Sequence, residues 1–130
     1  MNAFVDTSFY IARIMTHDQW RAKALRAVRP GMSFFTSSMV LNETISLLQA
    51  RGFFSAAVSF LRTIRLSQDV LIIYPDDALQ SDAWDLFARW GAAGANAVDC
   101  VSFAIMRKLS IRKAFTFDEH FRTAGFETLR

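Results

Sequence analysis

The chain has 130 residues, of which 52% are hydrophobic and 21% charged, a balance typical of a globular domain rather than a disordered segment. Cys100 is the only cysteine, which excludes an internal disulfide and a cysteine-based zinc site. No apolar run approaches the roughly 18 residues of a membrane span, and the amino-terminal segment carries Asp6 without a basic leader. We therefore expect a single domain over residues 1–130 that is cytoplasmic and has no membrane partner.

The net charge is small, because 15 basic residues stand against 12 acidic ones and leave an excess of +3. If four of the acidic side chains gathered in one site, the rest of the surface would carry +7. Such a surface would attract a polyanionic partner. An ordinary solvated surface explains the same composition, so the charge alone leaves the partner open.

Apolar and β-branched segments predict strands at residues 3–6, 32–37, 70–75 and 113–118, with a short last strand at 126–129. Helical patterns cover residues 7–15, 17–28, 39–52, 53–67, 76–91, 96–110 and 119–125. Pro30 and Gly31 end the second helix, while Ser37 or Ser38 can cap the third and Gly52 can end it. Because strands alternate with helices, we predict an α/β fold, a three-layer α/β/α sandwich around a mostly parallel sheet.

Four acidic residues occupy positions where the surrounding sequence pattern favours an apolar side chain. Asp6 ends the first predicted strand and Asp118 ends the fourth, so both should lie at the rim where ligands bind in open α/β sheets. Glu43 and Asp99 each emerge from a largely apolar face of a predicted helix. A buried carboxylate is unfavourable unless a charge or a metal ion compensates it, which makes these four acids candidates for one site.

A hard divalent cation would relieve the repulsion within such a cluster, and Mg²⁺ prefers oxygen ligands completed by substrate phosphate. That arrangement is typical of metal-dependent phosphodiester hydrolysis. Each acid also has a simpler interpretation when it is taken alone. Asp6 and Asp118 can cap the helices that follow them, Glu43 can pair with an arginine, and Asp99 can favour the helix dipole.

Three segments, "FVDTS", "SSMVLNET" and "AVDCVSFAIMRKLSIRKAFTFDEHF", resemble the PIN-domain family, and more closely its VapC-type toxins. The resemblance covers nearly the whole chain in the right order and spacing. It implies a PIN-like sandwich, Mg²⁺- or Mn²⁺-dependent cleavage of RNA to a 5′-phosphate and a 3′-hydroxyl, and a small antitoxin protein that blocks the site. It also implies a homodimer, which the apolar-rich composition favours as well.

The resemblance assigns the catalytic and metal-binding acids one by one, as Asp6, Glu43, Asp99 and Asp118, with Glu43 bound directly or through water. Thr116 matches a polar position two residues before the last acid, and Ser8 can orient Asp6 or cap the first helix. We therefore predict a metal-dependent endoribonuclease, the toxin of a toxin–antitoxin pair. The alternative is an inactive PIN-like module that binds RNA or protein.

One segment departs from the family pattern. The family often has serine or threonine before the third acid, whereas Val98 precedes Asp99 here, so a hydrogen bond that supports this carboxylate is expected to be missing. His120 follows Asp118 by two residues, and we interpret it as a surface histidine. Lys23, Arg26 and Arg29 are three residues apart and form a basic helix edge, which can be a solvated face or a contact for RNA phosphates.

Overall fold

A central sheet of four parallel strands organises the chain, as seen in a computed structural model that describes residues 1–129. The strands are β1 (Asn2–Val5), β2 (Ser33–Ser37), β3 (Val70–Ile73) and β4 (Lys113–Phe115), and their order in the sheet is β3-β2-β1-β4. The register pairs Phe4 of β1 with Phe35 of β2 on one side and with Ala114 of β4 on the other. All carboxyl ends therefore meet at one edge of the sheet.

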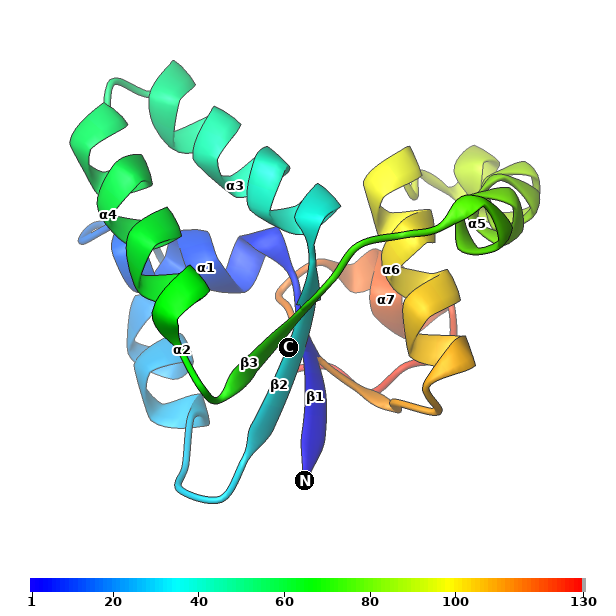
Figure 1. The fold of residues 1–130 in the computed structure, drawn as a ribbon, viewed down its shortest axis with the longest axis horizontal. Helices are drawn as coiled ribbons and strands as arrows, with labels where there is room; N and C mark the ends of the chain where they lie inside the picture. The colour runs from blue at the N-terminus through cyan, green and yellow to red at the C-terminus, as the bar shows by residue number, and fades with distance from the viewer. Residues whose placement is uncertain (130) are drawn as a thin grey trace.

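Helices cover both faces of this sheet, which confirms the predicted α/β sandwich (Figure 1). On one side lie α1 (Thr7–Ile14), α2 (Arg21–Ala27), α3 (Ser38–Ala50) and α4 (Phe54–Leu66). On the other side lie α5 (Asp77–Trp90), α6 (Ala97–Lys108) and the short α7 (Glu119–Thr123), with a 3-10 turn, η1 (Gly91–Ala93), between α5 and α6. Among the described residues, none of these helices has the length and apolarity needed to cross a membrane.

The neighbouring strands β1 and β4 carry much of the core. Phe4 and Phe115 are completely buried, and the ring of Phe115 packs 5.1 Å from that of Phe9 on α1. On the opposite side of the sheet, Phe103 of α6 meets Phe121 of α7 edge to face, with ring centroids 5.0 Å apart. Aromatic pairs of this kind stabilise beyond their buried area. The ends of β1 and β4 and the starts of α6 and α7 are therefore anchored in tightly packed surroundings.

Some boundaries differ from those predicted. The second helix begins at Arg21 and not at residue 17, because the carboxylate of Asp18 accepts a hydrogen bond from the Trp20 backbone N–H at 2.8 Å and stabilises a turn instead. The fourth strand ends at Phe115, which leaves Thr116 to Asp118 as a connection into α7. The predicted strand at 126–129 is reduced to one isolated bridge between Glu127 and Lys113, and Arg130 lies outside the described residues.

Candidate active site

Four distant segments of the chain bring their acidic side chains to one crevice at the carboxyl edge of the sheet. Asp6 follows β1, Glu43 lies on α3, Asp99 lies in the first turn of α6, and Asp118 follows β4. All four line the same cavity, whose volume is about 360 Å³. The structure thus brings together the four acids that the sequence singled out. Asp18, Trp20, Arg51 and Asn96 line this crevice as well.

Asp6 is held at the junction of β1 and α1, with only 3% of its surface exposed. Its Oδ2 accepts hydrogen bonds from Thr116 Oγ1 at 2.9 Å and from Ser8 Oγ at 3.2 Å. Its Oδ1 is buried and has no hydrogen-bond partner within the described residues. Burial raises the pKa of Asp6 to about 6, with a smaller contribution from the charges of Glu43 and Asp118, and the Thr116 hydrogen bond opposes this rise.

Ser8 and Thr116 tie the ends of β1 and β4 together through their hydroxyl groups, which lie 3.0 Å apart. The Ser8 oxygen accepts the Phe117 backbone N–H at 2.9 Å, and the Thr116 oxygen accepts that of Asp118 at 3.0 Å. Both hydroxyls therefore bridge one carboxylate to the backbone of the segment that carries another. Ser8 thus lies beside Asp6 as expected, and Thr116 contacts the same carboxylate, which the sequence did not predict.

Asp99 and Asn96 form a reciprocal capping box at the start of α6. The Asn96 side chain accepts the Asp99 backbone N–H at 2.8 Å, and Asp99 Oδ2 accepts the Asn96 backbone N–H at 3.0 Å. Val98 has no hydroxyl to donate, but the Asp99 carboxylate still accepts one hydrogen bond, from the Asn96 backbone. Burial raises the pKa of Asp99 to about 7, helped by the nearby charge of Asp6.

His120 lies beside the crevice, next to Asp118, and its side chain is 30% exposed, so its interpretation as a surface histidine holds only in part. Asp118 is the N-cap of α7, and its Oδ1 accepts the His120 backbone N–H at 2.9 Å and lies 2.7 Å from His120 Nδ1. The ring also lies against Gly94, where a Cβ atom would approach His120 Nε2 to 2.7 Å. Gly94 has a φ of +105°, so both its conformation and the contact favour glycine. This contact could not be predicted from local patterns, because it joins a loop to a helix 26 positions later.

Glu43 completes the crevice from α3, where it is half-buried. No ion pair with Arg13 or Arg51 forms within residues 1–129, so the predicted alternative of a structural pair is not realised there. Its charge raises the pKa of both Asp6 and Asp99. The four carboxylates therefore line one crevice without an ion pair to an arginine among the described side chains.

The donor set fits a divalent metal ion. Ligand atoms of Asp99, Asp118 and His120 lie within 4.8 Å of one another, and the unpartnered Oδ1 of Asp6 belongs to the same crevice. Carboxylate oxygens are the ligands that Mg²⁺ prefers, and a single imidazole is compatible with Mn²⁺. Burial first, and then repulsion by the neighbouring carboxylates, raises the pKa values of Asp6 and Asp99, and a bound cation would favour their charged forms.

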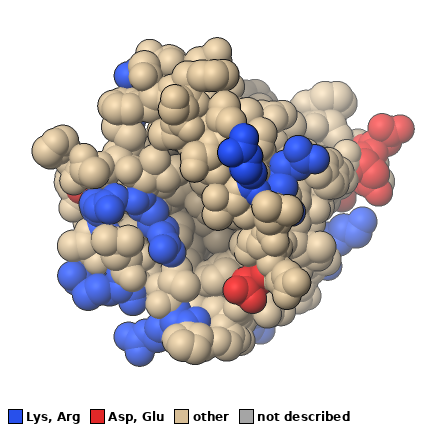
Figure 2. Space-filling view, turned by 60° about the vertical axis from the view of Figure 1, so that its left-hand side comes forward, with Lys and Arg blue, Asp and Glu red and all other residues tan. Residues whose placement is uncertain are grey.

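Basic side chains gather outside the crevice. Figure 2 shows Lys and Arg residues grouped on the face that comes forward from the left of Figure 1, where α2 and α4 lie. These helices contribute Arg21, Lys23, Arg26, Arg62 and Arg65. Arg29 was predicted to share a helix edge with Lys23 and Arg26, but it lies after the end of α2. Basic groups beside an acidic crevice suit a polyanionic substrate whose phosphate must reach a metal site.

A sandwich fold with an acidic crevice at the sheet edge is typical of a metal-dependent nuclease. The model of the PIN-domain family matches residues 3–127, so the chain belongs to this family. The chain is 40% identical over 129 residues to VapC20 of Mycobacterium tuberculosis, which is a 23S rRNA-specific endonuclease. The aligned region covers 98% of this chain and 97% of that relative. The predicted family is therefore confirmed, and the predicted class of function, an endoribonuclease toxin, is confirmed by the same relative.

Solved structures give the same result. The crystal structure of VapC20 from Mycobacterium tuberculosis, described as a sarcin–ricin loop cleaving toxin, matches with a TM-score of 0.87 at 38% identity and covers 95% of each chain. VapBC-1 from nontypeable Haemophilus influenzae matches with a TM-score of 0.61 at 13% identity, over 98% of this chain and 96% of that one. The second likeness supports the fold alone, and both confirm the predicted sandwich.

Proposed function

We propose that this protein is a metal-dependent endoribonuclease that cuts 23S rRNA in the sarcin–ricin loop, as the toxin of a toxin–antitoxin pair. The observation that carries this proposal is the convergence of Asp6, Glu43, Asp99 and Asp118 on one crevice. The relative at 40% identity supplies the substrate, since its name specifies 23S rRNA. Because the substrate is ribosomal, we place the activity in the cytoplasm, in a single domain over residues 1–130.

In this proposal Asp6, Asp99 and Asp118 hold Mg²⁺ or Mn²⁺, with Glu43 bound directly or through water. When bound, the metal ion supplies charge that polarises the phosphate and lowers the pKa of water. The reaction adds a water oxygen to phosphorus and breaks the bond to the 3′ oxygen, which leaves with a proton as a 3′-hydroxyl and leaves a 5′-phosphate. No side chain acts as a covalent nucleophile.

The remaining residues keep the carboxylates in position. Thr116 and Ser8 fix the Oδ2 of Asp6, so its unpartnered Oδ1 is the oxygen left to face the crevice. The Asn96 backbone N–H fixes one oxygen of Asp99 in the same way. Preorganised ligands of this kind lose little freedom when a cation binds, and partners that orient ligands commonly contribute 10–100-fold in metal affinity.

We further propose two protein partners. A small antitoxin protein would cover the crevice and present a basic side chain to the acids. A second copy of the chain would form a homodimer, and the exposed Trp84 and Phe87, one turn apart on α5, are apolar side chains of the kind that such an interface buries. Light scattering above micromolar concentration is expected to show a dimer, and a monomer would refute this part.

Cleavage of a synthetic sarcin–ricin loop hairpin by the purified protein tests the function. We expect one cut with a 5′-phosphate end in Mg²⁺ or Mn²⁺ and no cut in excess EDTA. Asp99→Asn is expected to remove cleavage, whereas the matched control Asp82→Asn, an exposed acid on α5, is expected to keep it. Equal cleavage in EDTA would refute the metal-dependent mechanism. RNA binding without any cleavage would instead favour the inactive binding module.

A further inference from the structure

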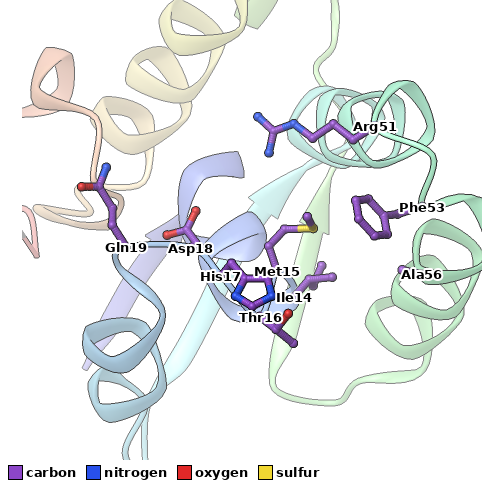
Figure 3. Close-up of a pocket in the computed structure, with 9 residues that line it drawn as sticks. All are labelled: Ile14, Met15, Thr16, His17, Asp18, Gln19, Arg51, Phe53 and Ala56. Atoms are coloured by element: carbon purple, nitrogen blue, oxygen red, sulfur yellow. The ribbon is translucent and has the colours of Figure 1, made fainter.

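A second cavity, of about 690 Å³, opens beside the acidic crevice between the segment that follows α1 and the turn that joins α3 to α4. Asp18 and Arg51 line both cavities, so the two cavities adjoin. Figure 3 shows Arg51 and Phe53 entering this cavity from the α3–α4 side, opposite Met15 and His17. Its volume lies within the roughly 300–1,000 Å³ typical of small-molecule sites.

The lining combines a flat aromatic ring, a flexible thioether and a cation. Phe53 is an apolar residue that remains 44% exposed, although large apolar side chains are usually covered. Met15 is half-buried and can adapt its shape to a neighbouring ring. The guanidinium of Arg51 makes no ion pair with a carboxylate within residues 1–129, which leaves its charge available to a phosphate.

The position of the cavity narrows the choice of occupant. If an RNA phosphate binds at the four acids, a neighbouring nucleotide can reach Asp18 and Arg51, because these two residues line both cavities. Unpaired bases in RNA loops are recognised by stacking on aromatic side chains and on arginine. A hydrogen bond from the Trp20 backbone to Asp18 keeps the rim of this entrance in a fixed turn.

We propose that this cavity receives an unpaired nucleobase of the RNA substrate, next to the bond that is cut, with the base stacked on Phe53 and the adjoining phosphate paired with Arg51. This inference rests on the proposed function and deepens it. The position of the cut in the RNA would depend on an unpaired base that turns out of the RNA loop into the protein. Phe53 and Arg51 are then specificity-determining residues, and neither takes part in the chemical step.

A cycle of substitutions in protein and RNA tests this proposal. Each unpaired loop nucleotide of the sarcin–ricin hairpin is replaced in turn by an abasic one, and binding is measured in the cleavage-inactive Asp99→Asn background. We expect one position beside the cut where the abasic change weakens binding about tenfold, the usual size for a base stacked on an aromatic ring. In Phe53→Ala the same abasic change should not weaken RNA binding any further. In Phe53→Trp the abasic change should again weaken binding, because the indole ring can stack on the base.

The chain offers a matched control in the neighbouring Phe54, which is 62% exposed and does not line the cavity. Phe54→Ala should keep the full response to the abasic change. The backbone N–H of Phe53 donates to the Leu48 carbonyl at 2.8 Å, a bond that a side-chain substitution leaves intact, and thermal melts verify that the variants fold.

The outcomes separate the two proposals. Wild-type protein that fails to cleave any RNA refutes the proposed function. Wild-type protein that cleaves, but shows no abasic position coupled to Phe53, refutes the base cavity and leaves the function in place. If Phe53→Ala instead weakens binding of the cognate antitoxin and leaves every RNA response unchanged, the cavity is a protein-docking site and the proposal is wrong.

Discussion

Replacing Asp6 by asparagine should stabilise the metal-free protein at neutral and alkaline pH. Burial raises the pKa of this carboxyl from its usual 3.8 to about 6. A difference of that size corresponds to about 3 kcal/mol of unfavourable free energy when the group is charged in the folded protein, at about 1.4 kcal/mol per tenfold change in protonation. The neutral amide of Asp6→Asn avoids this penalty.

The penalty of about 3 kcal/mol already includes the Thr116 hydrogen bond to the charged carboxylate, because that bond lowers the pKa of Asp6. Part of the gain is lost again because the new amide N–H₂ is buried, and a buried donor without a good partner costs about 1–3 kcal/mol. One amide oxygen can still take the place of Oδ2, and the amide N–H₂ then occupies the place of the unpartnered Oδ1 and faces the remaining acids. The expected net gain is about 1–2 kcal/mol, or roughly 3–8 °C in the melting temperature of a chain of this size.

The sign of the pH dependence follows from the raised pKa. Below pH 3.8 the carboxyl is protonated in both the folded and the unfolded protein, so its unfavourable contribution is absent. Stability falls as the pH rises through about 6 and stays low above it. Denaturant unfolding in EDTA should therefore show Asp6→Asn more stable than wild type at pH 8, with the difference vanishing near pH 4.

A control with an exposed carboxylate sets the baseline, and Asp69→Asn serves because Asp69 is exposed and lies outside the acidic crevice. Its stability should stay within about 0.5 kcal/mol of wild type. Asp6→Asn that is clearly less stable than wild type at pH 8 in EDTA would show that this acid stabilises the fold, and the reasoning from repulsion and burial would be wrong.

Three further predictions concern the supports of the site. Thr116→Val keeps the side-chain shape but removes the hydroxyl that bridges Asp6 to the Asp118 backbone, so Mn²⁺ affinity measured by calorimetry should fall about tenfold, and an unchanged affinity would count against the bridge. Gly94→Ala should destabilise the protein by about 1 kcal/mol more than Gly125→Ala in thermal melts. Both glycines have a positive φ, but only at Gly94 would the new methyl group meet the His120 imidazole, so equal losses would contradict this contact. Metal binding at pH 6 should release protons, since the pKa values of Asp6 and Asp99 are raised to about 6 and 7, and calorimetry in buffers of different ionisation enthalpy should show the release at pH 6 and its absence at pH 8.5.

The strand and helix pattern could be predicted because its causes are local. Apolar runs of four to six residues alternate with helical periodicity, and caps such as Ser37 stand where the helices start. Boundaries failed where a side chain competes with the regular pattern. Asp18 holds a turn that delays α2, and the polar Thr116 stops pairing in favour of its bonds to Asp6 and Asp118.

The four acids could be predicted because each is out of place in its own segment, and the topology of a parallel sheet then brings their segments to one edge. The rest of the crevice could not be predicted in this way. His120 lies beside it and against Gly94, Arg51 lines it from the turn after α3, and Phe53 lines the adjoining cavity. Each of these residues is unremarkable in its local sequence, so only the packing of distant elements reveals its place.

The central claim is that carboxylates from separate parts of the chain form one metal site, and a Mn²⁺ titration followed by electron paramagnetic resonance at pH 7.5 tests it most directly. The free Mn²⁺ signal should fall as wild-type protein binds the ion. Asp6→Asn and Asp99→Asn should each weaken that binding at least tenfold, whereas Asp82→Asn should bind as wild type does. Equal Mn²⁺ affinity in wild type and Asp6→Asn, or no binding by wild-type protein that still cleaves RNA, would contradict the account.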